Sequence, residues 1–250
     1  MINFFYGLNS FIQMLIAASI TLICTTFGAS FVYMMKKENK KVISVLLGLG
    51  AGIMLAAAIF SLLLPAINES DLLGFNSKLI IPFSIIFGCI FLIIGDKFTC
   101  KYSNSNNSFL LIVSIILHNI PEGLSIGFAF GSITNPSMIA PALSLAIGIA
   151  IQNIPEGAAI SLPLLNRGKS KHKSFLIGFL SGVVEPISAV LGYLLVSKIT
   201  ILLPFLLAFA AGAMIFVVVK ELIPESQDDN PNFISLVTVI GFVLMMLLEI

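Results

Sequence analysis

Eight long apolar stretches run along the chain, and short polar segments separate them. A helix that crosses about 30 Å of hydrocarbon needs roughly 20 mostly apolar residues, and every stretch meets this length. The expected spans, with ends approximate to a few residues, cover residues 9–35, 42–66, 79–98, 109–131, 139–164, 174–197, 201–224 and 232–250. Because all the connecting segments are short, we expect one all-α transmembrane domain, residues 1–250, with no soluble domain attached.

The composition supports an integral membrane protein. Of the 250 residues, 58% are hydrophobic and only 10% are charged, whereas ordinary soluble domains carry about 25% charged residues. The mean hydropathy is +1.09. A net charge of +1 gives no basis for nucleic-acid binding, which needs a basic surface. The lipid bilayer is therefore the expected environment.

The first apolar stretch lies where a signal peptide would lie. It has no positively charged segment before it, and its apolar run continues from about Phe11 to Met35. The apolar region of a signal peptide is shorter, about 7–15 residues. We therefore expect this stretch to be the first span and to be retained in the mature protein.

Lysine and arginine residues gather on one side of the eight spans. The first, third, fifth and seventh loops, counted with the adjoining helix ends, hold eleven of them, and the other loops hold only Lys78 and Lys198. Cytoplasmic loops are enriched in positive charge. The pattern predicts a multi-pass protein of the plasma membrane with both termini outside the cytoplasm.

One polar motif occurs twice inside apolar spans. The sequence HNIPEG covers residues 118–123, and QNIPEG covers residues 152–157. Residues three and four apart share a helix face, so each copy places a polar patch on an apolar helix. The patches consist of His118, Asn119 and Glu122, and of Gln152, Asn153 and Glu156. Each proline removes a backbone N–H and is expected to bend its helix and free a carbonyl group.

A third acidic residue, Glu185, precedes Pro186 in the sixth span. Three ionised glutamates inside the membrane would repel one another, so a positive charge must compensate them. Protonation is one solution. Metal coordination is the other, and the neighbouring His, Asn and Gln side chains favour it. Two divalent ions would bring four positive charges against three carboxylates, so two adjacent metal sites that share the glutamates are electrostatically reasonable.

The type of ligand narrows the choice of metal. Oxygen and imidazole ligands, with the thioether of Met54 as a weaker candidate because Met also fills gaps in cores, suit Zn(II), Fe(II), Mn(II), Co(II) or Cd(II) better than Cu(I). Sites for Mg(II) or Ca(II) seldom use His or Met. The three cysteines form no CxxC motif, and we interpret Cys24, Cys89 and Cys100 as packing residues.

A second internal similarity relates residues 46–54 to residues 206–214 at a constant offset of 160. Under the predicted topology these two spans run in opposite directions, as the two motif spans also do. Inverted repeats of this kind are typical of transporters, whose sites lie near the middle of the membrane. The alternative is that small residues recur because they allow close helix packing.

A membrane metalloenzyme and a proton-coupled carrier are the two competing classes of protein. A zinc protease needs HExxH and a di-iron enzyme needs ExxH on two helices; the chain has neither and only two histidines, so we expect no enzyme and no required cofactor. A proton-coupled carrier of a small organic solute, with glutamates as proton relays, stays open as the alternative and would transport without bound metal.

The paired motifs and the Glu-Pro of the sixth span resemble the ZIP family of zinc- and iron-regulated transporter-like proteins, in particular its bacterial branch of broad specificity. The resemblance extends from Gly52-Ile53-Met54 in the second span to residues 221–225, ELIPE, in the seventh. It implies eight helices in a 3+2+3 inverted repeat, outward termini and a two-metal site at mid-membrane. It also implies metal uptake into the cytosol across the cell membrane, which is the inner membrane in a bacterium that has two membranes. Members of the family are often homodimers.

The resemblance also implies which residues bind metal. One site would consist of Met54, His118, Glu122, Gln152 and Glu156. The other would consist of Asn119, Glu122, Asn153, Glu156 and Glu185. Ser61 would line the outer entrance.

The chain departs from the family pattern at two places. The loop at residues 103–108 is rich in Asn and Ser, where many relatives have a His-rich loop, so we expect no metal sensor there. Lys220-Glu221 stands where relatives often carry His-Glu at the inner exit, which leaves Glu221 and Glu225 for release. His172, flanked by lysines, is expected to be solvated.

Overall fold

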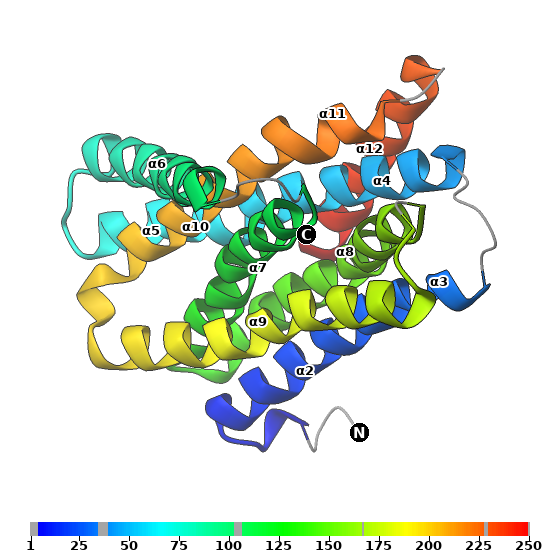
Figure 1. Cartoon of the computed structure of the whole chain (residues 1–250). Coiled ribbons are helices and arrows are strands. Elements are labelled where there is room, and N and C mark those ends of the chain that lie inside the picture. The colour runs from blue at the N-terminus through cyan, green and yellow to red at the C-terminus, as the bar shows by residue number, and fades with distance from the viewer. Residues whose placement is uncertain (1–4, 35–39, 103–106, 167, 228–229, 250) are drawn as a thin grey trace.

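The computed structural model describes residues 5–34, 40–102, 107–166, 168–227 and 230–249, and within these ranges it describes all side chains except those of residues 40, 96, 98–102, 107–118, 163 and 166. The described part of the chain contains helices and no β-strand. It forms one bundle of long helices (Figure 1). The predicted all-α class is therefore confirmed.

The helices follow one another with short connections. In chain order they are α2 Ser10–Ala29, α3 Phe31–Met34, α4 Lys40–Ala57, η1 Ala58–Leu63, α5 Leu64–Leu72, α6 Ser77–Tyr102, α7 Asn107–Gly131, η2 Pro136–Met138, α8 Ile139–Asn166, α9 Lys171–Lys198, η3 Thr200–Leu202, α10 Leu203–Val217, η4 Val218–Leu222, α11 Ile223–Ser226 and α12 Pro231–Glu249. Segments η1 and η4 are π-helices, and η2 and η3 are 3₁₀ turns.

Seven continuous helical segments within the described ranges are long and apolar enough to cross a membrane. They are Ser10–Met34, Lys41–Leu72, Ser77–Gly95, Pro136–Leu162, Lys171–Lys198, Thr200–Ser226 and Pro231–Glu249. Helix α7, with 25 residues, coincides with the predicted span at 109–131. The second span extends further than predicted, to Leu72 instead of residue 66. Hydropathy identifies only the apolar part of a helix, and the polar residues beyond residue 66 continue the same helical hydrogen-bond pattern.

The packing of the helices is nearly symmetric between the two halves. Helix α7 packs along α9 as α2 packs along α8, and α4 packs along α12 as α6 packs along α10. The contact of α4 with α8 likewise corresponds to that of α10 with α7. Exchanging α2, α4 and α6 with α9, α10 and α12, and α7 with α8, therefore reproduces the pattern. This is the predicted 3+2+3 inverted repeat.

The two π-helical segments occupy equivalent places in this repeat. Segment η1 begins at Ala58 and η4 begins at Val218, which keeps the offset of 160 that the sequence shows. The helix after each segment has a proline in its first turn, Pro65 in α5 and Pro224 in α11. Isolated π turns are frequent at functional sites because they disturb the regular register.

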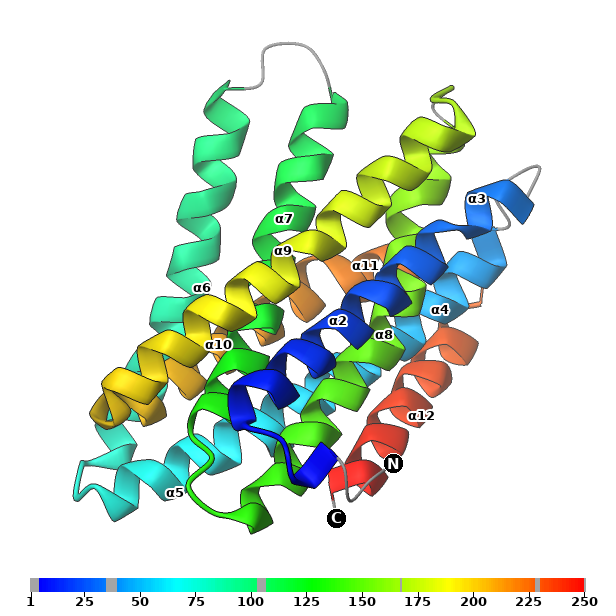
Figure 2. The ribbon, with the colours of Figure 1, turned by 90° about the horizontal axis from the view of Figure 1, so that it is seen from below.

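Both termini lie at one end of the bundle. Figure 2 shows them at the same end as the turn between α7 and α8, whereas the C-terminal end of α6 and the N-terminal ends of α7 and α9 lie at the opposite end. An even number of spans places the termini on one side, so this arrangement agrees with the count of eight.

Candidate metal site

Close contacts between backbones bring the two motifs against neighbouring helices. A Cβ atom at Gly123 would overlap the carbonyl oxygen of Glu185, and one at Gly157 would overlap the carbonyl oxygen of Thr25. Only glycine allows α7 to approach α9, and α8 to approach α2, this closely. The final residue of each NIPEG motif thus holds the polar patch of its helix against a partner helix.

The predicted polar residues of the motifs are buried together. Asn119, Glu122, Asn153 and Glu185 are completely inaccessible to solvent, and Gln152 is 2% exposed. Helix α7 continues through Pro121 and α8 continues through Pro155. The side chain of His118, one turn before Glu122 on α7, lies outside the described residues.

A direct hydrogen bond joins the two motifs. Gln152 Nε2 donates to Glu122 Oε1 over 2.9 Å. The other carboxylate oxygen of Glu122 and the amide oxygen of Gln152 are buried and have no hydrogen-bond partner within the described part of the chain. Glu156 lies one turn beyond Gln152 on α8 and is partly exposed.

The Glu185 carboxylate is held by three side-chain donors. Asn153 Nδ2 donates to Glu185 Oε2 over 2.7 Å. Thr25 Oγ1 and Asn119 Nδ2 donate to Glu185 Oε1 over 3.3 and 3.5 Å. Each amide also donates to a backbone carbonyl of the adjoining helix, Asn119 to Ser181 at 2.9 Å and Asn153 to Thr21 at 3.4 Å. The sequence analysis did not predict the contact of Thr25 with Glu185, because a lone hydroxyl in an apolar helix belongs to no motif.

Four buried oxygen atoms at this site have no partner. They are Asn119 Oδ1, Glu122 Oε2, Gln152 Oε1 and Asn153 Oδ1, and they make up most of the seven unpartnered buried side-chain atoms found among the described residues. Each can only accept a hydrogen bond while the glutamate is ionised. An unmade buried hydrogen bond costs about 1–3 kcal/mol, and a cation would satisfy several such oxygens at once.

Met54 joins this group across a small cavity. Met54 of α4 lines it together with Gln152 and Glu156 of α8, next to Leu222 of η4. No cluster of three or more His, Cys, Asp or Glu side chains suited to a metal lies within the described side chains. A metal bound by these residues would therefore rely on amide oxygens and the thioether as well as carboxylates.

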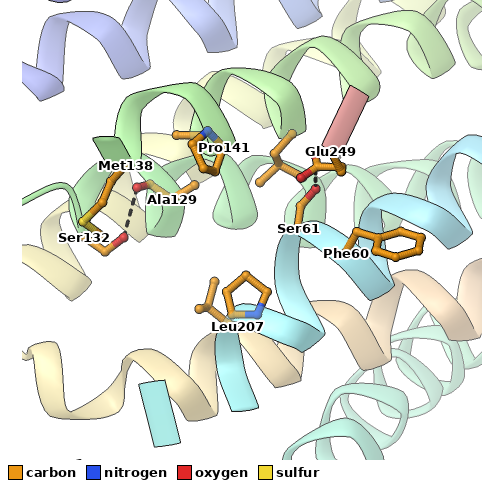
Figure 3. Close-up of a pocket in the computed structure, with 11 residues that line it drawn as sticks. Phe60, Ser61, Ala129, Ser132, Met138, Pro141, Leu207 and Glu249 are labelled. Carbon is orange, nitrogen blue, oxygen red and sulfur yellow. Dashed lines mark hydrogen bonds between the residues drawn. The ribbon is translucent and has the colours of Figure 1, made fainter. Parts of the chain in front are cut away.

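A larger cavity opens at the end of the bundle where the termini lie. It has a volume of about 210 Å³ and is lined by Phe60, Ser61, Pro65, Ala129, Ser132, Met138, Pro141, Ala142, Leu145, Leu207 and Glu249. Ser61 Oγ donates to Glu249 Oε1 over 2.6 Å, and Figure 3 shows the two side chains meeting among the residues that line the cavity. The sequence analysis placed Ser61 at an entrance and missed Glu249, whose only signal is a carboxylate at the end of the last span.

A pair of oppositely charged side chains lies at the other end of the bundle. Lys220 Nζ lies 3.3 Å from Glu221 Oε1 and 5.6 Å from the centre of the Phe216 ring. His172 is exposed, as expected, and its Nδ1 lies 3.4 Å from the Tyr33 hydroxyl. Cys24 and Cys89 are free thiols in partly buried positions, and the side chain of Cys100 lies outside the described residues.

Known proteins resemble this chain over the whole bundle. A sequence model of the ZIP zinc transporter family matches residues 103–249. Zinc transporter ZupT of Chlorobaculum parvum is 31% identical over an alignment that covers 94% of this chain and 96% of that protein. Zinc transporter ZIPB of Bordetella bronchiseptica is 32% identical, with 90% and 76% covered. Zinc transporter ZIP11 of Xenopus tropicalis is 46% identical over 144 residues, 56% of this chain and 43% of that protein, so this chain spans less than half the length of that relative.

Proposed function

This chain belongs to the ZIP zinc transporter family, and we propose that it carries zinc and related divalent transition-metal ions across the cell membrane into the cytosol. The observation that supports this proposal is the group of four buried, unpartnered oxygens contributed by the two NIPEG motifs. The unpartnered atoms of this group among the described side chains are all acceptors when Glu122 is ionised, and a cation would satisfy them.

The metal position is built on Glu122 and Glu156. Gln152 connects the two through its hydrogen bond to Glu122, and Met54 faces Gln152 and Glu156 across the small cavity. His118 is the fifth proposed ligand. Oxygen, nitrogen and thioether ligands together favour Zn(II), Fe(II), Mn(II), Co(II) and Cd(II) over Mg(II) and Ca(II).

A second ion beside Asn119, Asn153 and Glu185 is part of the family resemblance. It would have to displace the hydrogen bonds that both amides donate to Glu185. The homodimer that the resemblance implies is likewise a proposal.

The proposed transport movement follows from where the ligands lie. Helices α2, α7, α8 and α9 pack with one another, and α4 and α12 pack against α8 from another side. Met54 belongs to α4, whereas the motif residues belong to α7 and α8. Motion of one helix group against the other would therefore open the metal position to one side of the membrane at a time, with the cavity at Ser61 and Glu249 as the entrance.

Competitive uptake into proteoliposomes tests the proposal. With protein of known orientation, we expect saturable zinc uptake that Fe(II), Mn(II) and Cd(II) inhibit and that Mg(II) and Ca(II) leave unchanged. Glu156→Ala should abolish uptake while the protein remains in the membrane, because it removes one of the two central carboxylates.

The outcome that contradicts the proposal is equally specific. Normal zinc uptake by Glu156→Ala would disprove the site. Absence of uptake by folded wild-type protein, with no zinc found by elemental analysis, would favour the alternative of a proton-coupled carrier of an organic solute.

A further inference from the structure

The two π-helical segments place different charges at the two ends of the bundle. Ser61 of η1 and Glu221 of η4 are 160 residues apart, which is the offset of the internal repeat. Ser61 lines the larger cavity near the termini and donates a hydrogen bond to the carboxylate of Glu249. Glu221, its counterpart at the other end, lies 3.3 Å from the ammonium group of Lys220. The first end therefore has a carboxylate bonded by a neutral group, and the second has a carboxylate paired with a positive charge.

The repeat indicates that Glu221 lies on the pathway of the ion. In a transporter with inverted repeats, one group of helices moves against the other around the site. The counterpart of a residue that lines one mouth is therefore expected at the opposite mouth. The small cavity supports this placement, because Leu222, the residue after Glu221, lines it together with Met54 and Glu156. Segment η4 thus borders the proposed metal position.

Two contacts hold the Lys220 ammonium group at this place. Its Nζ atom lies 3.3 Å from Glu221 Oε1 and 5.6 Å from the centre of the Phe216 ring, and an ammonium group within about 6 Å of an aromatic ring is attracted to the face of that ring. The side chain of Lys220 is 41% exposed and that of Glu221 is 23% exposed. Ion pairs that are open to solvent contribute little to stability, so this pair has little effect on the fold.

Building on the proposed transport of divalent ions, we infer that the ammonium group of Lys220 is a resident cation that prevents a departing ion from binding tightly to Glu221. An ion that approaches Glu221 meets a positive charge beside it, and like charges repel. Lys220 itself is no metal ligand, because its ammonium group has no acceptor to offer. Glu225, one turn further on, is exposed, and salt screens its charge. Lys220 therefore sets how readily the ion is released.

Inhibition of uptake by zinc on the release side tests the inference. Proteoliposomes of known orientation receive increasing zinc on the side of Lys220, and the initial uptake of radioactive zinc from the other side is measured. Lys220→Met removes the charge and keeps an unbranched side chain, so Glu221 should then retain the ion. The zinc concentration that halves uptake should fall about tenfold relative to the wild type, the order expected when one nearby charge is lost at a partly exposed position.

Further variants isolate the charge as the cause. Lys220→Arg keeps the positive charge and should be inhibited as the wild type is. Lys169→Met removes an exposed lysine just before α9 and should leave the inhibition unchanged. Lys220→Met combined with Glu221→Gln should lose the added sensitivity, because the carboxylate that retains the ion is gone. Lys220→Gln also removes the charge and replaces Lys220→Met if that variant fails to fold.

The possible results separate this inference from the proposed function. Saturable uptake by the wild type, with equal inhibition of the wild type and Lys220→Met, would overturn the inference while transport stands. Added sensitivity that persists in the double variant would overturn the role of Glu221. No uptake by folded wild-type protein would overturn the transport proposal and the inference together.

Discussion

Glu249, the last residue of α12, is a carboxylate outside the central group. It lines the 210 Å³ cavity and accepts a hydrogen bond from Ser61 Oγ. The cavity walls are otherwise mostly apolar, with Phe60, Leu145 and Leu207 among them. A charge at the mouth of a cleft with walls of low polarity raises the local concentration of the oppositely charged ion.

Removing this charge should slow the capture of metal without changing its translocation. Glu249→Ala should raise the KM for zinc by about tenfold, in keeping with electrostatic steering, and leave Vmax near the wild-type value. Glu69→Ala is the matched control, because Glu69 of α5 carries the same charge and is not among the residues that line the cavity. Initial rates of uptake over a range of zinc concentrations give both constants. A loss of Vmax with an unchanged KM would contradict the capture role and assign Glu249 to a later step of transport.

At the candidate metal site, the residues that could be predicted from the sequence are those that belong to the repeated motif. The two motif copies predicted a group of polar residues, and its members Asn119, Glu122, Gln152 and Asn153 are buried. An ionisable residue inside an apolar span is expensive and rarely incidental. Thr25, and the carbonyls of Thr21 and Ser181, escaped prediction because only packing in three dimensions brings them to the amides. Which residues bind metal stays a prediction.

At the scale of helices, the motif glycines determine how closely the helices of the site pack. Gly123 and Gly157 permit the backbone contacts of α7 with α9 and of α8 with α2. Those contacts fix the distances from Asn119 and Asn153 to Glu185. The glycine of each NIPEG motif is therefore a packing residue, and its acidic neighbour is the proposed metal ligand.

Adding one methyl group at this contact should be destabilising. Gly123→Ala forces α7 away from the Glu185 backbone, and overpacking of this kind costs about 1–3 kcal/mol. Thermal unfolding in detergent, followed by circular dichroism, should show a Tm several degrees below that of the wild type, about 2–4 °C for each kcal/mol.

Gly50→Ala provides the control for this substitution. A Cβ there would meet its nearest neighbour, Pro155, at 3.9 Å, an ordinary contact. Its Tm should stay close to the wild-type value. Equal losses of stability in both variants would show that backbone flexibility, and not the contact with α9, is the cause.

The spans were predictable because hydrophobic length is a direct consequence of bilayer thickness. The π-helical segments that interrupt these spans could not be predicted. Segments η1 and η4 are as apolar as their surroundings apart from Ser61, Lys220 and Glu221, and nothing in composition distinguishes a π turn from an α turn. The repeat offset of 160 was visible in the sequence, and the structure adds that it relates these two segments as well.

For the molecule as a whole, the inverted repeat determines the count of spans and the placement of the termini. The same exchange of helices relates all the main packing pairs, and both termini lie at one end (Figure 2). Which side of the membrane this end faces is a prediction from the eleven positive residues in the odd-numbered loops against two in the others.

Reporter fusions test this orientation. Alkaline phosphatase fused after Glu249 should be active and green fluorescent protein fused there should be dark, because both termini are expected outside the cytoplasm. A fusion after Ser170, in the fifth loop, should show the reverse pattern and serves as the control. An inactive phosphatase at Glu249, with the control also reversed, would invert the whole topology and with it the direction of the proposed entrance.

The π-helical segments have a consequence for comparison of sequences between relatives. A π turn closes its hydrogen bonds one residue later than an α turn, so it behaves as an α-helix that has received a one-residue insertion. Deletion of one residue from η1 would remove this extra residue and leave a continuous α-helix. The residues beyond it would keep the faces that they now present, and Pro65 would still line the cavity, because the π turn already absorbs the extra residue. A gap of a single position in an alignment at this point, or at η4, therefore marks the loss of a π turn and leaves the register of the flanking helices unchanged.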